Sequence, residues 1–256
     1  MSQAEVIAIA NQKGGVGKTT TSVNLGSYLA DAGKKVLIID LDPQANATAG
    51  LGVRAGADEP TLYEMMMGVV LPEAAIKETA IKGLHVVPAT PDLAGAAIDL
   101  MDKPYREYRL RRAFKTLRDS YDFILIDCPP SLGLLTVNGL CAADRLIIPV
   151  QCEFYALEGL HQLLQTVELV RNHLNPHLQV LGAVLTMYDR RVALARKIAK
   201  EVRQTFPGHV FESIIPRNTA LAEAPSVGKT ILQYDKHSRG AKAYEYLSEE
   251  LINLYS

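Results

Sequence analysis

The sequence alternates short apolar runs with longer amphipathic stretches along its length. Seven of the short runs are rich in β-branched residues, and most are apolar at consecutive positions, as in strands of a parallel sheet buried between two helical layers. The expected strands are Val6–Ala10, Lys35–Asp40, Leu84–Pro88, Phe123–Asp127, Arg145–Val150, Val180–Thr186 and Phe211–Ile215.

Amphipathic stretches of helical length separate these runs. The expected helices are Thr19–Ala32, Pro91–Met101, Arg106–Ser120, Leu134–Ala142, Leu157–Leu174, Val192–Phe206 and Arg239–Leu254. Strands that alternate with helices predict βαβ units with right-handed crossovers. We therefore expect one α/β domain over residues 1–256, with a doubly wound, mostly parallel sheet that binds its ligand at the carboxyl ends of the strands.

A glycine-rich loop joins the first expected strand to the first expected helix. It reads Lys13-Gly14-Gly15-Val16-Gly17-Lys18-Thr19-Thr20. Glycines let backbone N–H groups converge on phosphate oxygens, and the start of the following helix adds its dipole. Lys18 would reach the β- and γ-phosphates, and the Thr19 hydroxyl would complete a magnesium shell. The loop therefore predicts a site for a nucleotide and Mg²⁺.

The loop departs from the generic pattern G-x4-G-K-[ST]. Gln12 stands at the place of the first glycine, and Lys13 is an additional lysine. Its position is awkward for contact with the phosphates of a nucleotide in the same chain. Lys13 either reaches the γ-phosphate of a facing subunit, as an arginine finger does in other phosphoryl-transfer enzymes, or is a solvated loop lysine.

Two of the expected strands end in aspartates. The second strand continues as Asp40-Leu41-Asp42, and the fourth delivers Asp127 just before Pro129 and Pro130, which force a turn. Asp127 is placed as a Walker B aspartate that serves magnesium. A carboxylate beside a phosphate loop either holds magnesium through water or orients the water that attacks the γ-phosphate, and Asp40 and Asp42 are candidates for both roles.

The net charge and the cysteines bear on DNA or membrane binding, on disulfide or zinc sites, and on the cellular compartment. The 256 residues carry a net charge of −1, so attraction to DNA or acidic lipid must come from a local patch. Cys128, Cys141 and Cys152 lack C-x-x-C spacing, which argues against disulfides or a zinc site and fits a reducing cytoplasm. Since no apolar run reaches transmembrane length and no signal peptide is evident, we expect a cytoplasmic protein.

Four segments together resemble one family. They are K-G-G-x-G-K-T-T, D-x-D-P-Q-x-N-x-T from Asp40, I-D-C-P-P-S around Asp127, and Ile215-Pro216-Arg217-Asn218. This combination is similar to the ParA/Soj family of deviant Walker A ATPases, which partition chromosomes and plasmids. The resemblance runs from the first strand to the last helix. The loop alone is shared with a wider superfamily that includes MinD and the nitrogenase iron protein.

The resemblance implies roles for individual residues. Lys13 corresponds to the signature lysine that crosses an ATP-bound homodimer, and Gly14 to the glycine that permits this approach. Asp42 corresponds to the residue that positions the hydrolytic water, with Asp40 and Asp127 near magnesium. The remaining loop residues, namely Gly15, Val16, Gly17, Lys18, Thr19 and Thr20, would bind phosphate and magnesium, and adenine would be held by Pro216, Arg217 and Asn218.

A basic segment precedes the expected adenine site. Its cations are Arg190, Arg191, Arg196, Lys197, Lys200 and Arg203. Val192, Ala195, Ile198 and Val202 recur at helical spacing and are expected to form a buried stripe. The charge pattern alone also fits a solvated helix. ParA-like proteins bind non-specific DNA as ATP-bound dimers, so the resemblance implies a DNA-binding face here. Ala220 stands where many relatives have another basic residue.

The resemblance also implies a cycle. A ParB-like partner would stimulate hydrolysis of ATP and release the dimer from the nucleoid DNA. A MinD-like positioning ATPase and a partitioning ATPase for a protein cargo are the alternatives within the superfamily. A MinD-like membrane protein would need a basic amphipathic helix at the C-terminus. The final stretch instead carries an acidic polar face and an apolar stripe that is expected to pack on the domain, formed by Ala243, Leu247, Leu251 and Leu254.

Three further classes of protein fit the sequence less well. A nitrogenase-like reductase would need cysteines that bridge a cluster between subunits, whereas the cysteines here are expected on three separate elements. A metabolic kinase or synthetase would transfer phosphate to a small molecule, with turnover unaffected by DNA. A non-catalytic scaffold would have no use for Asp42, because a carboxylate that positions water serves hydrolysis.

Overall fold

A single seven-stranded sheet forms the centre of the protein, as a computed structural model of residues 3–255 shows. The strand order is β3-β4-β2-β5-β1-β6-β7. All neighbouring strands are parallel except β3, which pairs with β4 in the antiparallel sense. The strands are β1 (Glu5–Ile9), β2 (Val36–Asp40), β3 (Lys77–Glu78), β4 (Leu84–Val87), β5 (Phe123–Asp127), β6 (Arg145–Gln151) and β7 (Gln179–Thr186).

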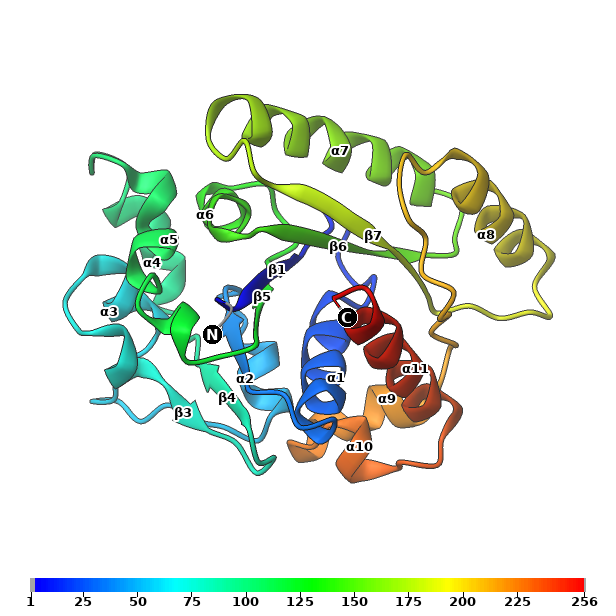
Figure 1. Cartoon of the computed structure of the whole chain (residues 1–256), viewed down its shortest axis with the longest axis horizontal. Helices are drawn as coiled ribbons and strands as arrows, with labels where there is room; N and C mark the ends of the chain where they lie inside the picture. Colours follow the sequence, from blue (N-terminus) through cyan, green and yellow to red (C-terminus); the bar gives the residue numbers. More distant parts are fainter. Residues whose placement is uncertain (1–2, 256) are drawn as a thin grey trace.

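Helices cover both faces of the sheet (Figure 1). One face packs against α1 (Lys18–Asp31), α2 (Asn46–Gly50), α9 (Thr219–Glu223), α10 (Ile231–Tyr234) and α11 (Arg239–Asn253). The other packs against α3 (Leu62–Met67), α4 (Leu93–Asp99), α5 (Arg109–Ala113), α6 (Leu134–Ala142), α7 (Ala156–His173) and α8 (Ala193–Thr205). Four 3₁₀ turns complete the described elements: η1 (Pro72–Ala75), η2 (Arg106–Tyr108), η3 (Leu117–Asp119) and η4 (Ala224–Val227).

Each central strand supplies side chains to two separate cores. In β1, Val6 and Ala8 belong to the core under α3 to α8, and Ile7 and Ile9 belong to the core under α1 and α11. All four are fully or almost fully buried. Because side chains alternate across a strand, an uninterrupted apolar run fills both cores at once. The expected doubly wound, mostly parallel sheet is confirmed.

One predicted strand, Phe211–Ile215, is not a strand. Its ends bond to β7, since the Phe211 N–H donates to the Ala183 carbonyl (3.0 Å) and the Ile215 N–H to the Leu185 carbonyl (2.9 Å). Between them, the N–H groups of Glu212 and Ser213 donate to the Glu250 carboxylate of α11 at 2.9 and 3.1 Å. The Ser213 N–H, which would continue the ladder with β7 after Phe211, is therefore bound to this carboxylate instead.

The predicted helix Arg106–Ser120 is divided into η2, α5 and η3. Asn138 of α6 explains the first division. Its amide donates to the Arg106 carbonyl (2.9 Å) and its carbonyl accepts from the Leu110 N–H (3.2 Å). In a continuous helix the Leu110 N–H would donate to the Arg106 carbonyl. Here the Asn138 side chain binds both groups and replaces that helical hydrogen bond.

The connections between strands contain short elements that the hydrophobic pattern did not predict: α2, α3 and β3 before β4, and α9 and α10 after β7. In the last helix, Ala243, Leu247 and Leu251 are buried as expected, whereas Leu254 is 47 % exposed. It lies just beyond the end of α11. Among residues 3–255, no helix combines the length and apolar character needed to cross a membrane.

Candidate active site

The phosphate loop lies between β1 and α1, at the carboxyl edge of the sheet (Figure 1). Asn11 sets its direction, because its amide donates to the Pro149 carbonyl (2.7 Å) and its side-chain oxygen accepts from the Lys13 N–H (3.0 Å). Gly15 and Gly17 adopt φ values of 72° and 91°, in the left-handed region. No side chain of residues 3–255 caps α1, which leaves its first N–H groups for an anion.

The two lysines of the loop point to different places. Lys18 is buried, and its ammonium donates to the Lys13 carbonyl at 3.2 Å. Burial lowers the pKa of Lys18, and the nearby Asp127 and Asp42 carboxylates oppose this shift. The Lys13 side chain instead is 35 % exposed, with its ammonium 3.6 Å from the Glu153 carboxylate of the same chain. Lys18 therefore faces the site, and Lys13 faces the surface beside it.

Asp127 lies fully buried at the end of the central strand β5. One carboxylate oxygen accepts from the Ser22 hydroxyl (2.9 Å), and the other has no hydrogen-bond partner among the residues that the structure describes. Burial and the adjacent Asp40 raise the pKa of Asp127, while the hydrogen bond from Ser22 and the charge of Lys18 lower it. A buried carboxylate oxygen without a donor fits a position that a cation serves.

Asp40 and Asp42 have different surroundings. Asp40 is level with Asp127 in the register of β2 and β5, and one of its oxygens accepts from the N–H (2.8 Å) and hydroxyl (2.6 Å) of Thr48. Burial raises the pKa of Asp40 despite these bonds. Asp42 is nearly buried, accepts from the Gln44 N–H (3.0 Å), and acts on Lys18 electrostatically. Both Asp40 oxygens thus accept hydrogen bonds, since the other accepts from the Asp42 N–H (3.3 Å), whereas within residues 3–255 only one Asp42 oxygen does so.

The raised pKa of Asp127 predicts a pH effect on stability. An unfolded aspartate titrates near 3.9, whereas burial keeps Asp127 protonated to higher pH in the folded chain. The folded state then binds more protons, so stability is greatest below about pH 3.9 for this group and falls as pH rises towards the folded-state pKa. We expect Asp127→Asn to raise the melting temperature of the nucleotide-free, metal-free protein at pH 8 and to reduce its pH dependence.

Melting curves at several pH values in a chelator would measure this effect. Asp119→Asn is the matched control, because Asp119 is an exposed aspartate elsewhere on the surface. An Asp127→Asn variant that melts below the parent at pH 8 would contradict the assignment.

A pocket of about 240 Å³ adjoins the phosphate loop. The predicted adenine residues Pro216, Arg217 and Asn218 line it together with Gly17 and Thr20 of the loop region. The Tyr188 carbonyl accepts from the Arg217 N–H (3.1 Å), and the Asn218 side chain caps α9 by accepting from the Leu221 N–H (3.2 Å). The shared pocket shows that the late segment lies beside the loop, although the two are far apart in the sequence.

Several residues of this site were not predicted. Thr186, Met187 and Tyr244 also line the pocket beside the loop. The Thr186 hydroxyl donates to the Val16 carbonyl (2.8 Å), which ties the end of β7 to the loop. Thr186 is the last residue of an expected strand, and this position at a carboxyl end could have identified it as a site residue. Glu153, which lies 3.6 Å from Lys13 and 3.4 Å from Arg217, had no sequence signal at all.

All six predicted DNA-binding residues are exposed on α8 and the turn before it. The six side chains differ in whether they already have a partner within the chain. Arg191 is bound by Asp189 (2.7 Å), Arg203 pairs with Glu212 (3.3 Å), and Arg196 donates to the Arg190 carbonyl (2.6 Å). Within residues 3–255, Lys197 and Lys200 form no ion pair.

The buried stripe of this helix differs from the prediction at one position. Ala195, Ile198 and Val202 are buried as expected, together with Ala199. Val192 is 48 % exposed, because it is the extended N-cap residue and the helix begins only at Ala193.

Comparison with known proteins gives consistent results. A family model described as an AAA domain matches residues 4–180. The chain is 53 % identical over 247 residues to the sporulation initiation inhibitor protein Soj of Bacillus subtilis, covering 96 % of this chain and 98 % of that protein. It is 51 % identical to the chromosome partitioning protein ParA of Caulobacter vibrioides, covering 97 % and 94 %.

Solved structures share both the fold and the length. Cobyrinic acid a,c-diamide synthase of Mycobacterium smegmatis, solved with ADP and magnesium, aligns with a TM-score of 0.86 at 39 % identity, covering 98 % of this chain and 95 % of that one. The cell division ATPase MinD of Pyrococcus furiosus aligns with a TM-score of 0.80 at 30 % identity, covering 98 % and 99 %. Given its identity to Soj and ParA over nearly full length, the chain belongs to the Soj/ParA family of chromosome-partitioning ATPases.

Proposed function

We propose that this protein hydrolyses ATP with Mg²⁺ as a homodimer that binds non-specific DNA, and that a ParB-like partner stimulates the hydrolysis. The observation that carries the proposal is the convergence of a glycine loop, the buried Lys18 and the Asp42 and Asp127 carboxylates at one edge of the sheet. The relatives named Soj and ParA, and the solved relative with ADP and magnesium, support the same chemistry.

The nucleotide would lie along the loop, with its base in the pocket formed by Pro216, Arg217 and Asn218. N–H groups of Gly14, Gly15, Val16 and Gly17, with Lys18, Thr19 and Thr20, would bind its phosphates. A bound Mg²⁺ would neutralise phosphate charge. Thr19 would hold it directly, and Asp40 and Asp127 through water; the unpaired Asp127 oxygen supports this assignment.

Hydrolysis requires a water aligned with the γ-phosphate, and Asp42 would orient that water. Lys13 would complete the site of the partner copy. Its partly exposed side chain, which lies beside Glu153 rather than against its own loop, supports this assignment. Because each site would lack one cation until two copies meet, turnover by the free chain is expected to be slow.

DNA would bind along α8 and the turn before it. Arg190, Arg191, Arg196, Lys197, Lys200 and Arg203 supply charge without base-reading geometry, which suits contacts with phosphates of any sequence. A dimer would double this weak patch, so nucleotide state would switch DNA binding and place the ATP-bound form on the nucleoid. Release would follow hydrolysis.

Retention on DNA tests this function. We expect the wild-type protein to be retained on non-specific duplex with ATP and not with ADP, and DNA to raise ATP turnover. Replacing both Lys197 and Lys200 by Ala should weaken retention more than replacing Arg191, because Asp189 already neutralises Arg191. For every phosphate that the variant no longer neutralises, the slope of log affinity against log salt should fall by about 0.9.

The measurement is binding to a random-sequence duplex over a range of salt concentrations, with and without ATP. Lys34→Ala and Lys35→Ala together form the control, since both lysines lie near the start of β2, away from α8. Retention that is independent of ATP would refute the proposed switch. A Lys197/Lys200 variant whose salt slope equals that of the wild type would show that DNA binds another surface of the protein.

A further inference from the structure

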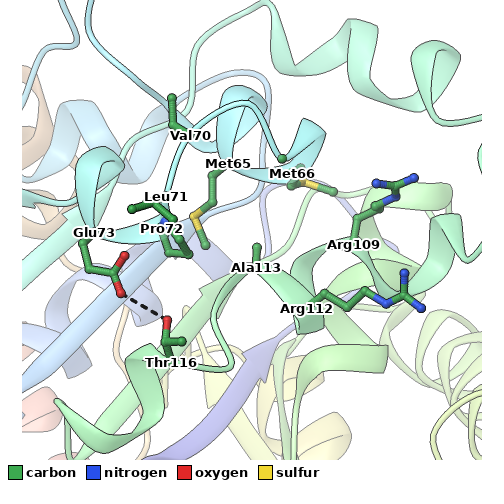
Figure 2. Close-up of a pocket in the computed structure, with 11 residues that line it drawn as sticks. Met65, Met66, Val70, Leu71, Pro72, Glu73, Arg109, Arg112, Ala113 and Thr116 are labelled. Atoms are coloured by element: carbon green, nitrogen blue, oxygen red, sulfur yellow. Dashed lines mark hydrogen bonds between the residues drawn. The ribbon is translucent and has the colours of Figure 1, made fainter.

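A pocket of about 610 Å³ lies between α3 and α5, outside the nucleotide site. Its floor is apolar and includes Met65, Met66 and Ala113, with Val70, Leu71 and Pro72 along one wall (Figure 2). Met65 and Met66 are buried under this surface.

The two ends of the pocket differ in charge. Arg109 and Arg112 lie at one end, and Glu73 and Thr116 at the other, where the Thr116 hydroxyl donates to the Glu73 carboxylate at 3.1 Å (Figure 2). Neither arginine forms an ion pair with any residue from 3 to 255, and the buried Nε of Arg109 has no acceptor there. Arg112 lies over the ring of Tyr105, 4.5 Å from its centroid. The arginine end therefore has unmatched positive charge.

Apolar surface continues beyond the pocket. Leu71 is 76 % exposed and Val69 is 73 % exposed, at the turn between α3 and η1, and Tyr105 is exposed beside Arg112. Large exposed apolar side chains grouped around a hollow are typical of a surface that binds a protein. A small molecule inside the pocket would leave this rim in water, whereas a helix laid across it would cover the rim.

The walls are fixed by bonds to the rest of the fold. Thr61 and Glu64 form a capping box that starts α3, and the Leu62 N–H donates to the Pro88 carbonyl at 2.9 Å. Asn138 holds Leu110 at the start of α5. The pocket is therefore preformed, so a partner would not have to order it.

We propose that this pocket, bounded by Met66, Leu71 and Arg112, docks an amphipathic helical segment of another protein that carries carboxylates beside its apolar residues. Apolar side chains of the segment would enter over Met65 and Met66, and its carboxylates would pair with Arg109 and Arg112. The inference requires neither ATP nor DNA and is independent of the function proposed above.

A pair of synthetic helical peptides of about 16 residues tests the docking surface. Both carry Leu on one face; one has Glu and the other Lys beside that face. Fluorescence anisotropy with the full chain is expected to show saturable binding of the Glu peptide and weak binding of the Lys peptide. Leu71→Asp and Arg112→Glu should each weaken the Glu peptide by about tenfold or more. Arg112→Glu should also strengthen binding of the Lys peptide.

Leu169→Asp and Arg171→Glu on α7 are matched controls, because Leu169 is also an exposed leucine, on a helix that does not line this pocket. Melting temperature and ATP affinity of every variant check the fold. Equal affinity for the two peptides, or variants at Leu71 and Arg112 that bind like the parent, would overturn the proposal. Self-association of the chain that Leu71→Asp abolishes would assign the surface to a second copy and would also overturn it.

Discussion

Replacing Lys13 by Ala is expected to lower DNA- and partner-stimulated ATP turnover by about 10³-fold or more, while the single chain still binds ATP. Lys13 lies outside its own site, with its ammonium 3.6 Å from Glu153 and its side chain 35 % exposed. Lys18, by contrast, is buried within the loop. Loss of Lys13 should therefore remove a charge from the partner's site and leave the chain's own nucleotide contacts in place.

Stimulated turnover and binding of a fluorescent ATP analogue would be measured side by side, with Lys35→Ala as the control for loss of a surface lysine. A mixing experiment separates action within a chain from action on the partner. If Lys13 acts across the dimer, equal amounts of Lys13→Ala and Asp42→Ala chains should form mixed dimers with one complete site, and recover up to about a quarter of wild-type turnover. A mixture as inactive as either variant alone would contradict action across the dimer.

Replacing Asp42 by Ala is expected to abolish hydrolysis, with a loss of about 10²–10⁴-fold, and to preserve ATP binding and ATP-dependent retention on DNA. Asp42 is nearly buried close to Lys18, and the fold uses one of its oxygens to accept from the Gln44 N–H. Asp40 differs, because Thr48 holds it at 2.6 and 2.8 Å. Truncation at Asp42 should therefore remove an interaction with water and spare the fold.

Phosphate release and DNA retention should be measured on the same preparation, with Asp58→Ala as the control at an exposed aspartate. Undiminished hydrolysis would refute the role assigned to Asp42. Loss of ATP binding together with hydrolysis would show instead that Asp42 holds the nucleotide or the loop.

The sheet was predictable because each parallel strand satisfies its own local rule. Its residues are apolar on both faces, and two of the strands, β2 and β5, end in an aspartate at the carboxyl edge, Asp40 and Asp127. The two main errors have non-local causes. Glu250 of α11 takes the N–H groups of Glu212 and Ser213, and Asn138 of α6 replaces a helical bond between Arg106 and Leu110. No local pattern identifies a side chain that arrives from a distant helix.

The candidate site shows the same division. The loop, Asp42 and Asp127 were predictable from short motifs, and Pro216 to Asn218 from the family resemblance. Thr186 reaches this pocket from the end of β7 through its bond to Val16 of the loop, and Tyr244 through the packing of α11 on α1, so neither has a motif of its own. The pairing of Arg191 with Asp189 and of Arg203 with Glu212 likewise reduced the free charge that a count of basic residues had predicted.

The unpaired oxygen of Asp127 has a consequence for the lifetime of the protein in a cell. A carboxylate buried without a full set of donors destabilises the chain whenever its site is empty. Ligands that bind only the folded state add stability in proportion to the logarithm of their concentration over the dissociation constant. Proteases act on the transiently unfolded form. A low ATP concentration is therefore expected to shorten the half-life of the nucleotide-free protein, and a high ATP concentration is expected to lengthen it.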